Sequence, residues 1–212
     1  MKKLQAGDIF LVDSDSFAAK MVKFLMTAPT VWHYIYRAIR GTQQKVRFYH
    51  AGICVSENYV AEQQSKVEFE TVENAILNKP AYVIYRKRGL TDEEMRNLID
   101  AAFNDLGYKY DWLLIISSFL TWFTGIKQFR SYIQLKNKEF CVTRVGKWYF
   151  QVLEETFGVL NWHNLTTDII DDWCSFYVED WEVIDSKTKD TPAPEFEDHI
   201  KRHMGLILGG SY

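Results

Sequence analysis

Cysteine, proline and long uncharged runs are scarce in this sequence of 212 residues, which has three cysteines and four prolines. The cysteines are widely spaced and form no Cys-x-x-Cys pair, which argues against a disulfide framework and against a structural zinc site. The basic start, Met1-Lys2-Lys3, is interrupted by Gly7-Asp8 before any apolar segment, so no secretion signal is predicted. We therefore expect a cytoplasmic protein.

Several common functional motifs are also absent. The sequence has no P-loop, no GxGxxG and no GxSxG, which argues against the usual nucleotide sites and serine hydrolases. The net charge of -3 gives no general attraction to nucleic acid. The uncharged run at 112–126 is shorter than the roughly 20 residues of a membrane-spanning helix. Its length favours a buried helix over contact with a membrane or lipid.

Apolar residues are plentiful, at 47% of the sequence, and aromatic residues make up 16%. This composition predicts a folded chain with a full core. We expect one domain over 1–185, followed by a linker and tail over 186–212 that begins with charges, Thr and Pro. His199 and His203 are four apart in the tail, but two histidines on a polar segment are typically solvated. No metal or organic cofactor is therefore expected.

The order of the predicted elements indicates an α+β protein with a central antiparallel sheet. Alternating or short apolar runs predict strands at 7–12, 49–55, 59–63, 67–72, 81–86 and 177–184, with 45–88 as a continuous meander. Apolar periodicity predicts helices after Ser14 or Ser16 and at 32–39, 91–107 and 138–158. Within 161–174, Thr166 or Thr167 is expected to cap a short turn of helix. The helix at 91–107 has the strongest signal, because Thr91 and Glu94 form a capping box.

The helix that contains Cys141 is the first candidate for chemistry. Asn137 is a suitable N-cap, which places Cys141 in or next to the first turn. The positive end of the helix dipole favours a thiolate there, and the free amides nearby can stabilise an oxyanion. Cys141 also shares one helical face with Val145, Trp148 and Val152, so it is equally consistent with a small buried hydrophobic residue.

A nucleophilic cysteine needs a base and a group that orients the base. His50 lies in a predicted strand and is the best candidate for the base, although a core histidine with a hydrogen bond fits the pattern equally well. The next strand offers Glu62, Gln63 and Gln64 as orienting groups. A three-residue loop at 56–58 places Glu62 on the face of His50, whereas a two-residue loop favours Gln63.

Five short motifs occur in an order that resembles one family, and the resemblance spans most of residues 7–184. They are Gly7-Asp8-Ile9, the strand His50-Ala51-Gly52-Ile53, the acidic Glu62, the turn with Gly107, Tyr110 and Asp111, and the pair Phe140-Cys141 at a helix start. In these features the chain resembles the circularly permuted NlpC-like papain-fold cysteine hydrolases, the YiiX-like group.

The resemblance implies a permuted papain-like fold, with the sheet packed on the helix that carries the nucleophile. It implies a triad in which Cys141 is the nucleophile, His50 the base and Glu62 the orienting group. The implied activity is that of an amidase or thiol protease on peptide-like amides, such as cell-wall peptides, without a cofactor. One departure is Val142, because the family usually has Ser directly after the nucleophile.

Two other functions remain open at this stage. The uncharged run at 112–126 motivates a lipid-directed thiol acyltransferase or thioesterase related to lecithin–retinol acyltransferase, which would take an acyl substrate. A binding module that keeps the fold without catalysis is motivated by Val142 and by four aromatic residues, Trp122, Phe123, Phe129 and Tyr132. The sequence predicts neither the substrate nor the oligomeric state.

Overall fold

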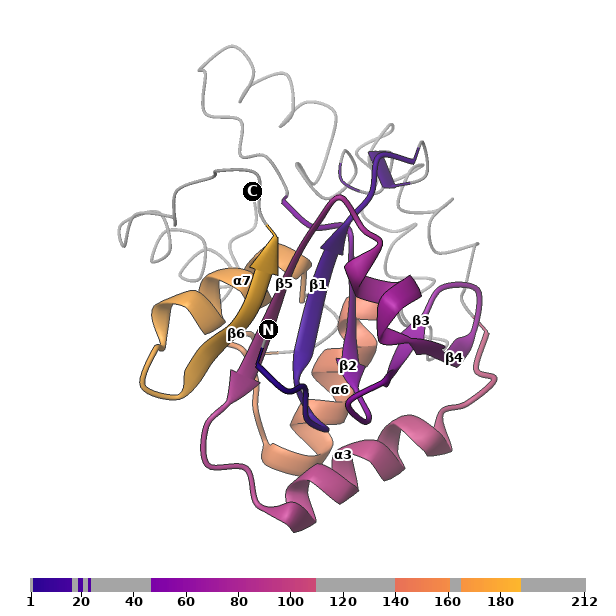
Figure 1. The fold of residues 1–212 in the computed structure, drawn as a ribbon. Coiled ribbons are helices and arrows are strands. Elements are labelled where there is room, and N and C mark those ends of the chain that lie inside the picture. The colour runs from indigo at the N-terminus through magenta and orange to yellow at the C-terminus, as the bar shows by residue number, and fades with distance from the viewer. Residues whose placement is uncertain are drawn as a thin grey trace, which may run out of the picture.

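The computed structural model describes residues 2–16, 19, 20, 23, 47–109, 140–160 and 165–187 (Figure 1). These residues form an α+β structure with a six-stranded antiparallel sheet in the order β4-β3-β2-β1-β5-β6. The strands are β1 (Ile9–Asp13), β2 (His50–Cys54), β3 (Tyr59–Gln63), β4 (Val67–Thr71), β5 (Ala81–Lys87) and β6 (Trp181–Lys187). The helices are η1 (Glu73–Leu77), α3 (Asp92–Asn104), α6 (Cys141–Leu153) and α7 (Thr167–Phe176).

Strand β1 occupies the centre of the sheet, and this corrects the predicted continuous meander over 45–88. Strands β2, β3 and β4 do form a meander, but β1 lies between β2 and β5. The chain passes from β4 to β5 through the π-helical segment η1. The run from Ile9 to Val12 is buried throughout, which suits a strand covered on both faces.

The two faces of the sheet have separate apolar cores. Ile9 and Leu11 point to one face, where they pack with residues of α3, α6 and α7. Phe10 and Val12 point to the other face, which is covered by η1 and the N-terminal segment. Helix α6 contacts β2 and α3, and Figure 1 shows it behind the central strands. This packing sets the start of α6 against the sheet.

Gly7 and Asp8 have structural reasons for their place before β1. Gly7 has a φ of +84°, and a Cβ there would lie 3.1 Å from the Leu98 side chain. Its carbonyl accepts a hydrogen bond from the Tyr149 hydroxyl on α6. The buried Asp8 carboxylate accepts two hydrogen bonds from Arg86 on β5, each of 2.7 Å. These contacts connect β1 to both β5 and α6.

Several predicted boundaries are confirmed and others are wrong. The capping box of α3 is present, but Phe103 on its expected apolar face is 59% exposed. Helix α6 ends at Leu153 instead of Gly158, because Glu154 adopts a left-handed conformation with φ 54°. Strand β6 is displaced from 177–184 to 181–187, because Tyr177 to Asp180 form a turn.

Some predictions lie outside the described residues. They are the helix at 32–39, the uncharged run at 112–126, the aromatic residues at 122–132, residues Tyr110 and Asp111, and His199 and His203 of the tail. Strand β6 continues to Lys187, past the start of the predicted linker at Ser186. Within the described part of the chain, no helix has the length and apolar character to cross a membrane.

Candidate active site

Cys141 lies in the first turn of α6, as predicted, but the helix begins at Cys141 instead of 138, and its cap differs from the prediction. The N-cap is Phe140, which has an extended backbone, and not Asn137. The Thr143 hydroxyl accepts the Phe140 N–H at 2.7 Å and donates to the Phe140 carbonyl at 3.0 Å. This bonding satisfies the Phe140 backbone, and no cap side chain takes up the first-turn amides beside the cysteine.

His50 and Glu62 form a buried hydrogen-bonded pair. The Nε2 atom of His50 lies 2.7 Å from Oε2 of Glu62, and the two residues are 5% and 1% exposed. The other carboxylate oxygen accepts a bond of 2.6 Å from Nε2 of Gln64. Because Nε2 of His50 is occupied by Glu62, Nδ1 is the ring nitrogen that is left for another partner.

The register of the β2–β3 hairpin brings this pair together. Gly52 pairs with Glu62, which is the register predicted for a three-residue loop at 56–58. Gln63 therefore points away from His50, as expected for the next residue of a strand. The role of Glu62 as the orienting group remains a prediction, but the register of a two-residue loop, which would turn Gln63 to His50, is excluded.

Gly52 leaves space for an aromatic ring beside the histidine. A Cβ at this position would lie 2.5 Å from the Phe10 ring and 2.6 Å from the Ala61 carbonyl oxygen. The Phe10 ring centroid lies 6.3 Å from that of His50. The glycine of the His-x-Gly-Ile strand is thus required by close packing.

The thiol of Cys141 is the third member of the arrangement. Burial alone would raise its pKa, but the charge and hydrogen bond of His50 lower it, with further bonds from the Ala51 and Val142 amides. Burial also opposes the imidazolium, yet Cys141 and Glu62 raise the pKa of His50 to about 10. The pKa of Glu62 is lowered by His50 against the effect of burial. At neutral pH these directions favour a thiolate–imidazolium pair.

The other two cysteines have the opposite electrostatics. Cys54 and Cys174 are buried free thiols, and burial raises the pKa of each above its ordinary value. Neither lies at the start of a helix, since Cys54 ends β2 and Cys174 is in the second half of α7. Burial is therefore common to all three thiols, while the lowered pKa belongs to Cys141. Cys141 itself is only 7% exposed.

Tyr49 is a residue near the site that the sequence reasoning did not select. Its ring centroid lies 5.7 Å from that of His50. Burial raises the pKa of Tyr49 to about 12, and the negative charges of Glu62 and Cys141 contribute. The phenol therefore stays protonated and can donate a hydrogen bond. Its position next to His50 in the chain was the only available signal.

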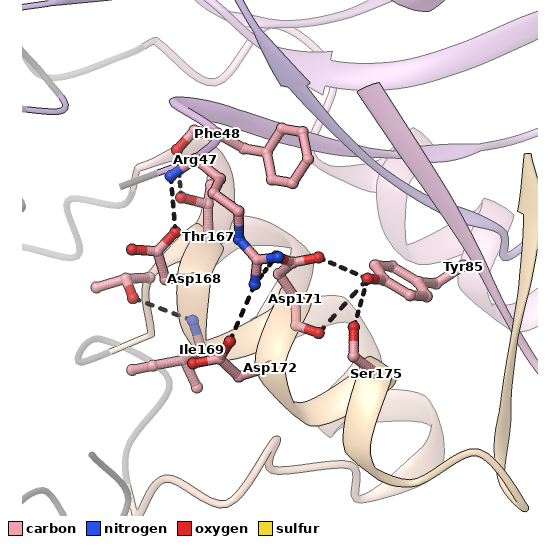
Figure 2. Close-up of polar contacts among 10 residues, drawn as sticks. Arg47, Phe48, Tyr85, Thr167, Asp168, Ile169, Asp171, Asp172 and Ser175 are labelled. Atoms are coloured by element: carbon pink, nitrogen blue, oxygen red, sulfur yellow. Dashed lines mark hydrogen bonds and ion pairs between the residues drawn. The ribbon is translucent and has the colours of Figure 1, made fainter. Parts of the chain in front are cut away.

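An ion-pair cluster connects the segment before His50 to helix α7 (Figure 2). The Arg47 guanidinium contacts the Asp171 carboxylate and lies 3.1 Å from Oδ1 of Asp172. Its backbone N–H donates to Oδ1 of Asp168 at 3.2 Å. Both Asp171 and Asp172 are almost fully buried, so a bridging guanidinium offsets part of their desolvation. The start of β2 is thereby fixed to α7.

Further hydrogen bonds extend this connection. The Thr167 hydroxyl donates to the Phe48 carbonyl at 2.6 Å. Figure 2 shows Tyr85 of β5 on the other side of the cluster, where its hydroxyl donates to Oδ1 of Asp171 at 2.5 Å and contacts Ser175 at 2.8 Å. Helix α7 therefore bonds both to β5 and to the chain at Phe48, two residues before β2 begins at His50. Sequence patterns gave no indication of these contacts between distant segments.

Helix α6 is connected to α3 through side chains of its first two turns. Asp105, which follows α3, accepts hydrogen bonds from Arg144 at 2.8 Å and from the Trp148 indole at 3.0 Å. Burial would raise the pKa of Asp105, but the Arg144 charge and these bonds lower it. The carboxylate therefore remains charged and fixes the first turns of α6, including Cys141, relative to α3.

The described residues contain no group of three or more His, Cys, Asp and Glu side chains suited to a metal ion. Within the part of the chain that the structure describes, the histidine–carboxylate pair near Cys141 is that of His50 with Glu62. The observed chemistry of the site is that of a thiol, an imidazole and a carboxylate. Such a set is suited to nucleophilic attack on a carbonyl group.

No family model matches the sequence, and no curated protein matches it. One similar solved structure is that of metalloprotein yiiX from Escherichia coli O157:H7 (DUF1105), with a TM-score of 0.47 and 18% sequence identity. The match covers 91% of this chain and 99% of that chain. At this identity and score the similarity bears on neither activity nor site residues.

Proposed function

We propose that this chain is a cysteine hydrolase with a permuted papain-like, NlpC-type arrangement. Cys141 is the nucleophile, His50 the base and Glu62 the group that orients His50. The observation that carries the proposal is the buried series of hydrogen bonds from the thiol through the imidazole to the carboxylate. Burial by itself keeps a thiol protonated, and at Cys54 burial and the Asp8 charge raise the pKa although the Arg86 charge opposes them.

The first half of the reaction forms an acyl-enzyme. The Cys141 thiolate attacks the carbonyl carbon of an amide, and a C–S bond forms as the carbonyl electrons move to oxygen. The backbone amides at the start of α6 stabilise this oxyanion. The His50 imidazolium then donates its proton to the amide nitrogen. The C–N bond breaks, the amine leaves, and a thioester remains on Cys141.

The second half releases the acid and restores the enzyme. His50, now neutral, accepts a proton from a water molecule as that water attacks the thioester carbonyl. The C–S bond breaks, a carboxylic acid leaves, and the thiolate and imidazolium are restored. Glu62 stays ionised throughout and fixes the imidazole tautomer through Nε2. None of these steps requires a metal or an organic cofactor.

The proposed substrates are peptide-like amides, such as cell-wall peptides. The test is hydrolysis of a panel of short peptide amides by the full chain, followed by detection of the thioester on Cys141 by mass spectrometry. Cys141→Ser should abolish turnover, whereas Cys54→Ser and Cys174→Ala should retain it if they fold. Turnover that survives in Cys141→Ser would exclude the proposed nucleophile.

A second candidate, a binding module without catalysis, is favoured by one observation. Cys141 is only 7% exposed, so a substrate needs a local opening of the chain to reach the sulfur. In this case the thiol would be inert in the native protein. Native alkylation of Cys141 separates the two candidates, because a catalytic thiolate must be reached by a small reagent.

A further inference from the structure

Gln63 has a buried side chain whose polar atoms lack partners. The residue is 1% exposed, and among the described residues neither its amide nitrogen nor its amide oxygen has a hydrogen-bond partner. Buried polar side chains are nearly always hydrogen-bonded, because an unpaired buried donor or acceptor destabilises the fold. An exception of this kind requires a specific reason.

The Gln63 side chain points to the face of the sheet that α6 covers. Glu62 reaches His50 on one face, and successive residues of a strand point to opposite faces. Gln63 pairs with Val67 of β4, and Val67 belongs to the same apolar core as Val142 of α6. The carboxamide is therefore directed to the side of the sheet on which α6 begins.

The strand register indicates that the same residue lies across from the segment that contacts the Cys141 sulfur. The pairing of β2 with β3 runs from Cys54 to Gly52, and its next step would set Ala51 opposite Gln63. Opposite residues in an antiparallel pair lie about 5 Å apart. The Ala51 amide instead donates to the Cys141 sulfur. The sulfur thus lies where the two strands separate, with Gln63 on the strand across from it.

A free carboxamide at this point has a clear chemical preference. It offers N–H donors and one carbonyl acceptor side by side. An amide ligand offers the matching carbonyl and N–H, so it can pair with both, whereas an ester or thioester has no N–H for the Gln63 oxygen. The neighbouring Gln64 cannot act in this way, because its side chain is bonded to Glu62.

We propose that Gln63 is a specificity-determining residue that pairs its carboxamide with an amide group of the substrate at Cys141. This inference rests on the proposed function and extends it, because it selects amides over esters. In the free protein the unpaired carboxamide is a destabilising feature that binding relieves. Removal of the amide should therefore stabilise the free protein while it weakens recognition of amides.

The test uses two alkylating agents of similar size, iodoacetamide and methyl iodoacetate, with peptide mapping of the rate at Cys141 in the full chain. In Gln63→Met, the iodoacetamide rate relative to the ester rate should fall about fivefold or more, as expected for the loss of one or two hydrogen bonds. Gln64→Met is the matched control, and it should slow both reagents alike because it acts through Glu62. Gln63→Met should also melt above the wild type.

An unchanged ratio in Gln63→Met, or a melting temperature below that of the wild type, would overturn the proposal. Should Gln63→Met not fold, the wild type gives an independent measurement, in which N-methylacetamide should protect Cys141 from methyl iodoacetate better than methyl acetate does. Equal protection would contradict the inference. Failure of the proposed function has a different signature, namely a Cys141 that reacts no faster than a denatured thiol with either reagent.

Discussion

Gly52 stands opposite Glu62 in the β2–β3 pairing, and this register directs the Glu62 carboxylate to His50, two residues before Gly52. The pair is diagonal across two strands, at a separation that long side chains can span. A shift of one residue would turn Glu62 to the other face and bring Gln63 to the histidine. The length of one loop therefore decides whether the imidazole has a charged or a neutral partner.

Glu62→Gln tests the charge of that partner. The substitution keeps a hydrogen-bond acceptor for His50 but removes the charge that stabilises the imidazolium. The pKa of His50 should fall from about 10, and the pKa of Cys141 should rise in turn. We expect the midpoint of the pH profile of Cys141 alkylation to move up by about one unit, equivalent to about 1.4 kcal/mol.

Glu68 provides the control for this variant. It lies on β4 directly opposite Glu62, and its side chain is 38% exposed. Glu68→Gln removes one carboxylate charge from the position across the strand pair, where the carboxylate is solvated. The alkylation midpoint should stay at the wild-type pH. A midpoint that moves equally in both variants would mean that Glu62 acts only through the net charge of the sheet.

Gly52→Ala tests the close packing beside His50. An added Cβ would lie 2.5 Å from the Phe10 ring and 2.6 Å from the Ala61 carbonyl oxygen, and the backbone atom cannot move aside easily. Overpacking of this kind destabilises by about 1–3 kcal/mol. Denaturant unfolding should show this loss. Gly89→Ala, where no atom lies within 4 Å, is the comparison and should lose about 1 kcal/mol through its positive φ alone.

Asp168→Asn tests the cluster of Figure 2 through pH. Burial raises the pKa of Asp168 to about 7, with Asp171 and Asp172 adding to the effect and the Arg47 amide opposing it. A carboxyl group with a raised pKa binds more protons in the folded state, so stability falls as pH rises from about 4 to about 7. Asn cannot ionise, and this loss should disappear.

Asp168→Asn should raise the free energy of unfolding by about 1 kcal/mol at pH 8 and leave it nearly unchanged at pH 4. This gain is smaller than the raised pKa of Asp168 alone would give, because the side chain is partly exposed to solvent. Melting temperatures at the two pH values measure it. Asp180→Asn, at an exposed aspartate in the turn before β6, should change neither value. A stabilisation by Asp168→Asn that is the same at both pH values would show that ionisation is not its cause.

The local features of the site could be predicted from the sequence. A three-residue loop sets the hairpin register, and an apolar face with an N-terminal cysteine sets the start of α6 near 141. The predicted cap at Asn137 was wrong because the helix begins at Cys141, where Phe140 is the N-cap without a capping side chain. The preference of one residue type for the cap position does not fix a helix start when tertiary packing of the apolar face starts the helix elsewhere.

The long-range features could not be predicted. β1 pairs between β2 and β5 because it is the strand that is covered on both faces. The apolar pattern within one strand does not show which of several apolar strands takes that central position. The contacts of Arg47 join residues more than 100 positions apart, at Asp168 and Asp172. The unpaired state of Gln63 depends on three elements that meet only in the folded chain.

The most direct test of the central claim is the rate of Cys141 alkylation by iodoacetamide between pH 5 and pH 9, in the wild type and in His50→Ala. With a thiolate–imidazolium pair, the wild-type rate should be nearly constant from pH 6 to 8, whereas in His50→Ala it should rise about tenfold per pH unit as an ordinary thiol does. Parallel profiles, or a wild-type Cys141 that reacts only after unfolding, would contradict the account.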